Sequence, residues 1–368
     1  MKTVCKLNQC AGCKACLDIC KKNAISIVDS LSAMNASIDE NLCVNCGACE
    51  KVCPNNSVLQ MKRPQEWYQG WVDATRQTSS SGGVATGLME SFIRNGGYVA
   101  AFKNGEFVFD ITNDLNYAKK FAGSKYVKSN PQNIYKKVSE KIRAGNKVMF
   151  IGLPCQVAAV KNYIKKCDNL YTIDLICHGS PSPQILSGFL HENNVDIQSI
   201  SELKFRNKEG FGLQSGYKRI SFDNESDLYT FAFLTSLDYT ENCYSCRYAT
   251  LDRVSDITLG DSWGSELEAE EQKKGISLIL CQTEKGKELL NNTKIELRDV
   301  DLNKAVEANH QLSHPSKMPT ERKIFFKNID KGFYHAISRC HPKMYYIRRL
   351  KYLLRKAKIV RGGSRSKN

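Results

Sequence analysis

The sequence predicts an α/β protein, α+β overall, in which a small cysteine-rich domain precedes a larger α/β domain and a basic C-terminal helix. Two identically spaced cysteine runs near the start of the chain predict the first part. Short apolar segments that run into loops and helices from Lys147 onward predict the second. Basic and apolar residues at helical spacing near the end predict the third. We expect domain boundaries at residues 1–62, 63–342 and 343–368.

The small N-terminal domain is predicted from two cysteine runs with the spacing C-x2-C-x2-C-x3-C. In this pattern three thiolates on one turn bind one 4Fe-4S cluster, and the fourth cysteine reaches across to the other cluster. The expected ligands are Cys10, Cys13, Cys16 and Cys53 for one cluster, and Cys43, Cys46, Cys49 and Cys20 for the second. Zinc sites and disulfides fit less well, because zinc ligand pairs are usually separated by a longer arm. The pattern also expects proline after the fourth cysteine. Pro54 meets this expectation and Lys21 departs from it.

Cysteine usage predicts the compartment. The chain has 16 cysteines, which would form disulfides in a secreted protein. However, Met1–Cys5 contains no apolar run that could begin a signal peptide, and no segment approaches the roughly 18 uncharged apolar residues of a membrane span. We therefore expect a cytoplasmic protein whose thiols are reduced or bound to metal.

A glycine-rich segment follows the N-terminal domain. Lys62–Gln65 is a polar stretch that suits a linker, and Gln77–Gly83 then precedes a predicted helix over Val84–Arg94. The unpaired amides and the dipole of a helix start favour an anion, and Gly82 and Gly83 allow close approach, so this segment suits a phosphate group. A serine cap with a glycine turn is an ordinary alternative.

Parallel α/β units are predicted in the larger domain, after a β-hairpin formed by Tyr98–Phe102 and Phe107–Phe109. The first unit is a strand over Val148–Ile151, a loop that ends at Cys155 and a helix over about 156–165. The second is a strand over Leu170–Ile176, a loop that begins at Cys177 and a helix from about 184. Open α/β sheets assemble their sites at the carboxyl ends of strands, so the two cysteines are expected to face one crevice.

Four cysteines outside the N-terminal domain are candidates for a third metal site. Cys243 and Cys246 form a C-x2-C turn ahead of a predicted strand over Asp256–Leu259. With Cys155 and Cys177 they fit a third 4Fe-4S cluster, a zinc ion, a redox-active pair or inert buried thiols. The remaining cysteines, Cys5, Cys167, Cys281 and Cys340, are expected to have no function. His178, next to Cys177, is either a hydrogen-bonding loop residue or a catalyst.

The end of the chain predicts a basic amphipathic helix. The formal net charge is +15, and from Lys343 to Asn368 there are ten Lys or Arg residues and no acid, so the body is nearly neutral. Apolar residues at helical spacing are Tyr346, Leu350, Leu353, Leu354 and Ala357. We interpret this helix as docked on its own domain with a solvated basic face, the alternative being contact with anionic lipid or an acidic partner. Nucleic acid is not an expected partner, because no binding motif accompanies the charge.

Taken in order along the chain, these segments resemble the beta-subunit family of coenzyme F420 hydrogenases and dehydrogenases, in the form with a fused N-terminal 2x(4Fe-4S) ferredoxin domain. The matching segments are the two cysteine runs, Ser80–Gly83, Gly152–Gln156, Asp174–Gly179, Phe205–Lys208, Cys243–Cys246 and Gly260–Gly264.

The resemblance implies an FAD-binding α/β domain with one 4Fe-4S cluster close to the flavin, held by Cys155, Cys177, Cys243 and Cys246. It makes Ser80, Ser81, Gly82, Gly83 and Lys125 candidates for binding FAD. Candidates for the flavin or substrate face are His178, Arg206 and Asp261. The implied function is an oxidoreductase that passes electrons between a ferredoxin or other electron-transfer protein, its clusters and FAD, and an organic substrate such as coenzyme F420. A non-catalytic electron-transfer subunit of a larger redox complex is the alternative, and a zinc-bearing interaction protein is a remote third.

Overall fold

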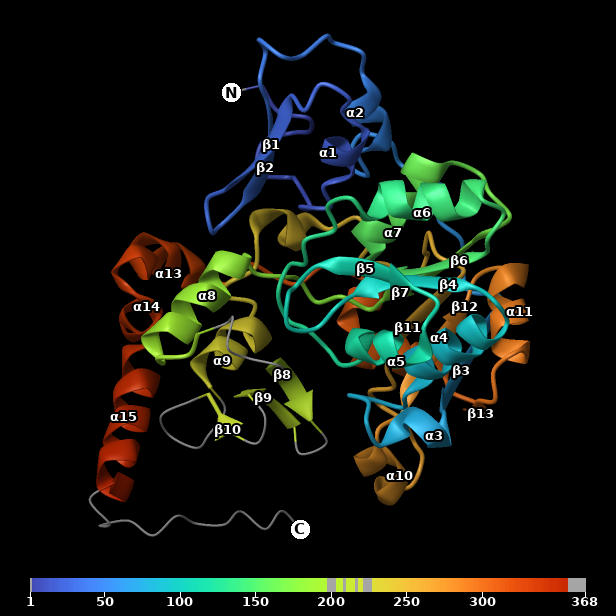
Figure 1. The fold of residues 1–368 in the computed structure, drawn as a ribbon. Helices are drawn as coiled ribbons and strands as arrows, with labels where there is room; N and C mark the ends of the chain where they lie inside the picture. The colour runs from blue at the N-terminus through green and yellow to red at the C-terminus, as the bar shows by residue number, and fades with distance from the viewer. Residues whose placement is uncertain (1, 197–202, 208–209, 216–217, 221–226, 357–368) are drawn as a thin grey trace.

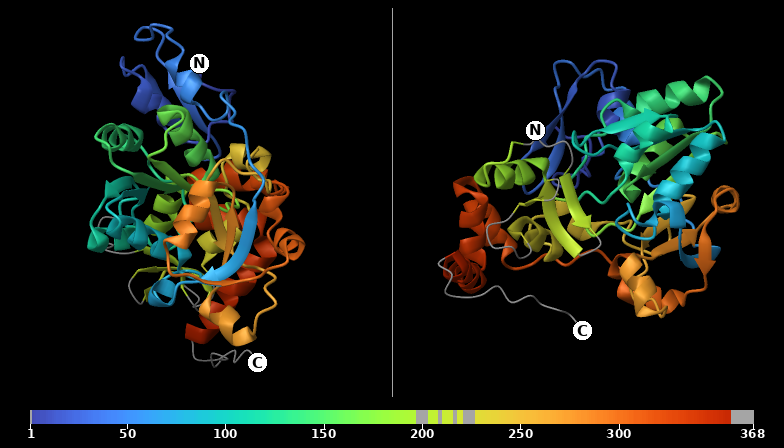
Figure 2. Two further views of the ribbon diagram at one scale, coloured as in Figure 1. Left: turned by 90° about the vertical axis from the view of Figure 1, so that its right-hand side faces the viewer. Right: turned by 60° about the horizontal axis from the view of Figure 1, so that its bottom comes forward.

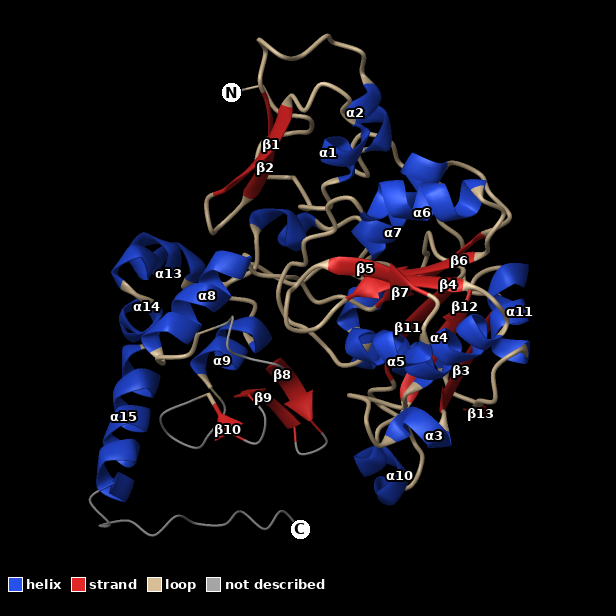
Figure 3. Ribbon diagram, in the orientation of Figure 1, coloured by secondary structure: helices blue, strands red, loops and turns tan. Residues whose placement is uncertain are grey.

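The computed structural model describes residues 2–196, 203–207, 210–215, 218–220 and 227–356 (Figure 1). Three regions are visible. The N-terminal domain lies at one end, a large sheet covered by helices forms the middle, and a mainly helical lobe carries the C-terminal helix (Figures 1 and 3). The predicted α/β class, with a small N-terminal domain and C-terminal helices, is confirmed.

The large sheet has eight strands in the order β13-β3-β12-β11-β7-β6-β4-β5. Strands β4, β6, β7 and β11 are parallel, and the strands outside them are antiparallel. The bounds are β3 (Glu66–Trp71), β4 (Tyr98–Phe102), β5 (Phe109–Thr112), β6 (Val148–Gly152), β7 (Leu170–Leu175), β11 (Ile257–Asp261), β12 (Ser277–Cys281) and β13 (Glu296–Arg298). The predicted parallel units are therefore confirmed.

Helices cover both faces of this sheet, which explains why β6 is apolar throughout. Met149 and Ile151 belong to the core that includes residues of α4 (Val84–Arg94) and α11 (Glu284–Asn291). Val148 and Phe150 belong to the core on the other face, with residues of α6 (Ile134–Arg143) and α7 (Pro154–Ile164). The helix predicted over Val84–Arg94 is thus confirmed at its predicted bounds.

The N-terminal domain packs against α6 and α7. It consists of α1 (Ala15–Ile19), α2 (Ala48–Val52) and the antiparallel pair β1 (Ile25–Asp29) and β2 (Met34–Ile38). The carboxylate of Asp18 accepts hydrogen bonds from the amides of Asn133 and Tyr135, at the start of α6, and the Tyr135 hydroxyl donates to the Cys13 carbonyl at 2.7 Å. A residue of the small domain therefore caps a helix of the large one.

A second core forms the C-terminal lobe. Buried Phe189, Phe205, Tyr229, Phe325 and Phe333 meet there. Its elements are α8 (Pro183–Glu192), α9 (Leu228–Leu234), α13 (Arg322–Asn328), α14 (Phe333–Cys340), α15 (Pro342–Lys356) and a three-stranded sheet of β8 (Leu203–Asn207), β9 (Gly210–Ser215) and β10 (Lys218–Arg219). The remaining elements are α3 (Asp73–Arg76), α5 (Leu115–Ala118), α10 (Ala269–Lys274), α12 (Leu302–Ala308), η1 (Lys119–Phe121), η3 (Glu241–Ser245), η4 (His310–Leu312) and η5 (Ile329–Lys331).

Two local predictions need adjustment. The hairpin of β4 and β5 forms, but its second strand begins at Phe109 instead of Phe107. Phe107 has a φ of 53° and its ring packs against Phe102 and Phe205, at centroid distances of 6.1 and 6.4 Å, so tertiary contacts remove it from the strand. The proposed linker is also bound to the body, because Lys62 and Arg253 exchange two backbone hydrogen bonds. The domain boundary itself stays a prediction.

The C-terminal helix is confirmed as far as Lys356, but its apolar side is not docked. Tyr346, Leu350 and Leu353 are exposed, so the interpretation that only the basic face is solvated is wrong. Ala357 and all later residues lie outside the described part of the chain, as does Lys208. Among the described residues, no helix has the length and apolar character that crossing a membrane requires.

Candidate iron-sulfur site

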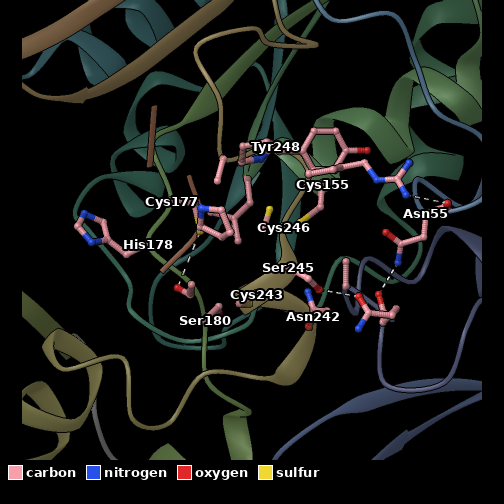
Figure 4. Close-up of a pocket in the computed structure, with 18 of the residues that line it drawn as sticks. Asn55, Cys155, Cys177, His178, Ser180, Asn242, Cys243, Ser245, Cys246 and Tyr248 are labelled. Atoms are coloured by element: carbon pink, nitrogen blue, oxygen red, sulfur yellow. Dashed lines mark hydrogen bonds between the residues drawn. The ribbon is translucent and has the colours of Figure 1, made fainter. Parts of the chain in front are cut away.

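A cavity of about 470 Å³ lies where the N-terminal domain meets the carboxyl edge of the large sheet (Figure 4). Its lining includes Cys155, Cys177, Cys243 and Cys246, the four cysteines predicted to act together. Because β6 and β7 are neighbouring parallel strands, the loops that follow them meet at one edge and bring Cys155 and Cys177 together. The structure therefore gathers the four thiols from three separate segments around one space.

The loop that carries Cys155 is fixed by its neighbour Gln156. The Gln156 side chain accepts a hydrogen bond from the Leu153 amide at 2.9 Å and donates one to Ser129 at 2.7 Å. Pro154 occupies the first turn of α7, so Cys155 lies at a helix N-terminus, where the helix dipole favours a thiolate.

Burial makes this cavity a poor place for unbound thiolates. It raises the pKa of Cys155 to about 12, and it also raises the pKa values of Cys177 and Cys246, with the negative charges of the other cysteines adding to the effect. Buried thiolates of this kind are stabilised by a bound metal centre, since metal binding releases the thiol protons.

Cationic side chains offset the negative charge of the cysteines. Lys128 is 6% exposed and donates to the Ala11 carbonyl at 3.2 Å, and Arg253 is 1% exposed; both line the cavity. Although burial lowers the pKa of Lys128, the negative charges of the surrounding cysteines raise it above its usual value. Lys6 and Arg247 also line the cavity. This wall suits an anionic occupant, such as an iron-sulfur cluster with four thiolate ligands.

Within the ranges that the structure describes, no three His, Cys, Asp or Glu side chains are grouped as ligands of a single metal ion. A cubane presents four separate irons, so its ligands need not converge on one point. Size, charge and donor set together fit a cubane in this cavity.

The same cavity touches the N-terminal domain. Gln9, Ala11, Asn55 and Asn56, which flank Cys10 and Cys53 in sequence, form part of its wall. Ser245, inside the C-x2-C turn, donates to the Gln9 side chain at 2.9 Å, and Arg247 donates to the Asn55 carbonyl at 3.3 Å. The turn is therefore fastened to the loops that carry two of the predicted N-terminal ligands.

The eight N-terminal cysteines fall into a buried and an outer set. Cys10, Cys13, Cys16 and Cys53 are 6–8% exposed, whereas Cys20, Cys43 and Cys49 are partly exposed and Cys46 is exposed. Burial raises the pKa of Cys13, and the charges of Cys16, Cys10 and Cys53 add to this, so these four thiols lie near one another. Burial likewise raises the pKa of Cys49, and Cys20 contributes. The assignment of the eight thiols to two ligand sets stays a prediction. Buried Cys5, which the sequence left without a role, lies beside Cys10 and Cys53.

The candidate FAD residues lie together, at the start of α4. The Ser124 amide donates to the Ser80 hydroxyl at 3.0 Å, which joins the Ser80–Gly83 segment to the loop that holds Lys125. No side chain caps the start of α4, so its first amides suit a phosphate. However, Lys125 does not point outward. Its ammonium donates to the carbonyls of Phe121, Ala122 and Gly123, and burial lowers its pKa to about 7.

Packing alone explains why glycine occupies positions 82 and 83. A Cβ on Gly82 would lie 2.7 Å from the Ser277 amide, and one on Gly83, whose φ is 79°, would lie 2.8 Å from the Arg76 amide. Both positions therefore need glycine for packing against β12 and α3.

The three residues predicted for the flavin or substrate face are also close together. The Arg206 guanidinium pairs with the Asp261 carboxylate at 2.6 Å and lies over the rings of Phe211 and Trp263. His178 lines the cavity, and burial together with nearby His310 lowers its pKa to about 4, with Asp261 acting in the opposite direction. Its Nδ1 lies 2.7 Å from the side-chain nitrogen of Gln311, so a neutral imidazole can accept that hydrogen bond.

Comparison with known proteins identifies two parts of the chain. Residues 145–303 match the family described as the C terminus of the coenzyme F420 hydrogenase/dehydrogenase beta subunit, and residues 9–57 match the 4Fe-4S dicluster domain. No curated protein matches the chain. Among solved structures, a chain of the xenon-derivatised F420-reducing [NiFe] hydrogenase complex from Methanosarcina barkeri is 19% identical, with a TM-score of 0.48 over 75% of this chain and 97% of that chain. Residues 9–57 are thus identified as a 4Fe-4S dicluster domain, and residues 145–303 as the C-terminal domain of the coenzyme F420 hydrogenase/dehydrogenase beta-subunit family.

Proposed function

We propose that this protein is an iron-sulfur flavoprotein oxidoreductase that exchanges electrons between a ferredoxin-like partner and coenzyme F420 or another organic substrate. The observation that carries the proposal is the cavity whose wall joins four cysteines of the large domain to the ligand loops of the dicluster domain. Iron-sulfur clusters transfer single electrons, and FAD would supply the two-electron chemistry that an organic substrate needs.

Cys155, Cys177, Cys243 and Cys246 are the proposed ligands of a third 4Fe-4S cluster. Lys128 and Arg253 are buried against the same cavity and compensate the charge of such a group. Residues near the proposed inner ligands Cys10 and Cys53 in sequence form part of the cavity wall, and the exposed Cys46 lies in the outer set. They support a path of electrons that runs from the surface inward, toward the sheet edge.

For FAD, we propose that the start of α4 holds a phosphate group, with Ser80 and Ser81 beside it. Arg206, Asp261 and His178 would face the flavin or the substrate. Arg206 is positioned by Asp261 and by two aromatic rings, so its guanidinium is held in one orientation and can stabilise negative charge on a bound ring. His178, with its lowered pKa, is neutral at pH 7, and because its Nδ1 accepts from Gln311, its Nε2 carries the hydrogen and can donate a hydrogen bond to the bound ring.

Removing one proposed ligand tests the third site. Anaerobically purified protein is expected to hold about 12 Fe per chain, and Cys243→Ala about 8, since each cubane contains four irons. We also expect Cys243→Ala to lose turnover while its N-terminal clusters remain reducible by dithionite. Iron and sulfide analysis, together with EPR spectra, provides the measurement. Cys167→Ala is the matched control, because Cys167 lies outside every proposed ligand set. An iron content of about 12 in Cys243→Ala would contradict the assignment.

The contacts of Lys125 and of the two glycines at the start of α4 with other parts of the protein favour a second candidate function, that of an electron-transfer subunit. If these residues act only in folding, the chain is an electron-transfer subunit without its own flavin. Flavin analysis after gentle purification, and again after reconstitution with FAD, distinguishes the two functions. We expect one FAD per chain, and a chain that binds none under either condition is the electron-transfer subunit.

A further inference from the structure

Helix α15 carries an apolar stripe that no other part of the described chain covers. Tyr346, Ile347, Leu350 and Leu353 are 60, 45, 57 and 51% exposed. At 100° per residue, these four positions fall on one side of the helix. Large apolar side chains exposed together in this way mark an interaction surface more often than chance exposure does.

The opposite side of α15 is attached to the lobe. Tyr345 is 8% exposed within the core of the lobe, and the Arg348 guanidinium lies 5.6 Å from the ring centroid of Phe231 on α9. These contacts fix how the helix is rotated about its axis. The stripe is therefore held facing away from the protein and is not free to turn inward.

Positive charge borders the stripe. By helical geometry Arg349 lies next to Leu353 on one edge of the stripe, and Lys351 lies next to Ile347 on the other edge; both basic residues are exposed. From Lys343 to Asn368 the sequence contains ten Lys or Arg residues and no acid. An apolar stripe with cations along both edges is the arrangement of helices that lie in the headgroup region of a bilayer.

We propose that α15 binds the surface of an anionic lipid membrane. The stripe would insert at the boundary between the lipid headgroups and the acyl chains, a depth that also suits the ring and hydroxyl of Tyr346. The flanking cations would contact lipid phosphates. We favour lipid over an acidic protein because the charge is of one sign along the whole segment and flanks the stripe on both sides. A lipid surface presents phosphates on every side of an inserted helix.

The fold makes this attachment compatible with electron transfer. In Figure 1 and in the left view of Figure 2 the N-terminal domain lies at the end of the molecule away from α15. A protein held by α15 would therefore keep its dicluster domain directed away from the bilayer. The proposal does not depend on which cofactors the chain binds.

Vesicle sedimentation tests the proposal with the full-length protein. We expect the protein to sediment with vesicles that contain phosphatidylglycerol and to stay in solution with vesicles of phosphatidylcholine alone. Binding should weaken as salt is added, because the cation contacts are screened. The double variant L350D/L353D should lose at least about tenfold in affinity, because two inserted leucines are replaced by charges that lipid disfavours.

The matched control is Leu234→Asp, because Leu234 on α9 has the same exposed fraction as Leu353, 51%. It should bind anionic vesicles as the unmodified protein does. Circular dichroism checks that each variant is folded. The double variant R349E/K351E leaves the apolar stripe intact and should also weaken binding to anionic vesicles, because it removes the flanking cations. The proposal is overturned if the unmodified protein ignores anionic vesicles. It is also overturned if the folded stripe and charge variants both bind as tightly as the control, or if an acidic protein binds α15 while vesicles do not.

Discussion

At the scale of single residues, Asp238 is a carboxylic acid with almost no compensation for its burial. It is 0% exposed, and neither carboxyl oxygen has a hydrogen-bond partner among the described residues. Burial raises its pKa to about 8, and the charge of Arg322 only partly opposes the shift. The folded protein therefore holds a proton at Asp238 that the unfolded chain releases at about pH 4.

This difference predicts how stability depends on pH. The contribution of protonated Asp238 is complete below about pH 4 and is lost as pH rises toward about 8, at about 1.4 kcal/mol per pH unit. Asp238→Asn, which is neutral at every pH, should therefore raise the melting temperature more at pH 8 than at pH 5. Thermal unfolding under anaerobic conditions provides the measurement. Asp330→Asn, at an exposed acid, is the control. If Asp238→Asn changed the melting temperature equally at both pH values, the pKa of Asp238 would not be raised in the folded protein.

Residues of this kind could not be found from the sequence. The cysteine ligands are predictable because their chemistry needs a fixed local spacing, such as C-x2-C at Cys243 and Cys246. Lys128, Arg253 and Asp238 have no such spacing. Each is significant only because segments distant in sequence bury it, and a sequence pattern treats charged residues as exposed. Lys128 lies only three residues after Lys125. The sequence predicts a role for Lys125, but it gives no sign that Lys128 is the buried cation that faces the cysteines.

At the scale of elements, the approach of α4 to the sheet depends on glycine. Gly82→Ala would place a methyl group 2.7 Å from the backbone nitrogen of Ser277, which cannot move without disturbing β12. We expect a loss of about 1–3 kcal/mol in the free energy of unfolding, measured by denaturant titration of the anaerobic protein. Gly188→Ala is the control. It lies in α8 with no atom within 4 Å of the added Cβ, and it should be neutral or stabilise the helix by up to about 1 kcal/mol. Equal stability of both variants would remove the packing explanation for Gly82.

Strands and helices can be predicted where burial produces a simple pattern of apolar residues in the sequence. The strand β6 is a continuous apolar run because helices cover both faces of the sheet. The helix α4 was predictable because its apolar residues recur at helical spacing directly after a glycine-rich turn. The second hairpin strand was misplaced because Phe107, a good strand residue by type, leaves the ladder to pack with aromatic rings of another segment. The lobe formed by α8, α9 and α13–α15 was not expected as a unit, because its core joins segments about a hundred residues apart.

At the scale of the whole molecule, Lys128 lies where the two cysteine-bearing domains meet. Its ammonium bonds to the carbonyl of Ala11, one residue past Cys10, and it lines the cavity of the four later cysteines. One cation is therefore shared by two neighbouring sites. A positive charge near a cluster favours its reduced form, so we expect Lys128 to raise the reduction potential of a cluster bound at this junction.

Lys128→Met keeps most of the side-chain volume and removes the charge. We expect the midpoint potential of at least one cluster to fall by several tens of millivolts, since a unit charge a few Å away in a medium of effective dielectric constant about 20 contributes about 1–3 kcal/mol. EPR-monitored redox titration provides the measurement. Lys285→Met is the control, because Lys285 bonds to carbonyls of Cys167 and Leu170, at the opposite end of β7. Unchanged potentials in Lys128→Met would mean that the cation does not act on the clusters.

The unequal burial of the N-terminal cysteines also sets where damage by air begins. Dissolved oxygen reaches the outer set around exposed Cys46 before it reaches the inner set, whose members are 6–8% exposed. If electrons follow the proposed path, oxidation of the outer set would block exchange with a ferredoxin-like partner while the inner ligands are still intact. We therefore expect a sample handled briefly in air to retain much of its iron and colour after it has lost that exchange.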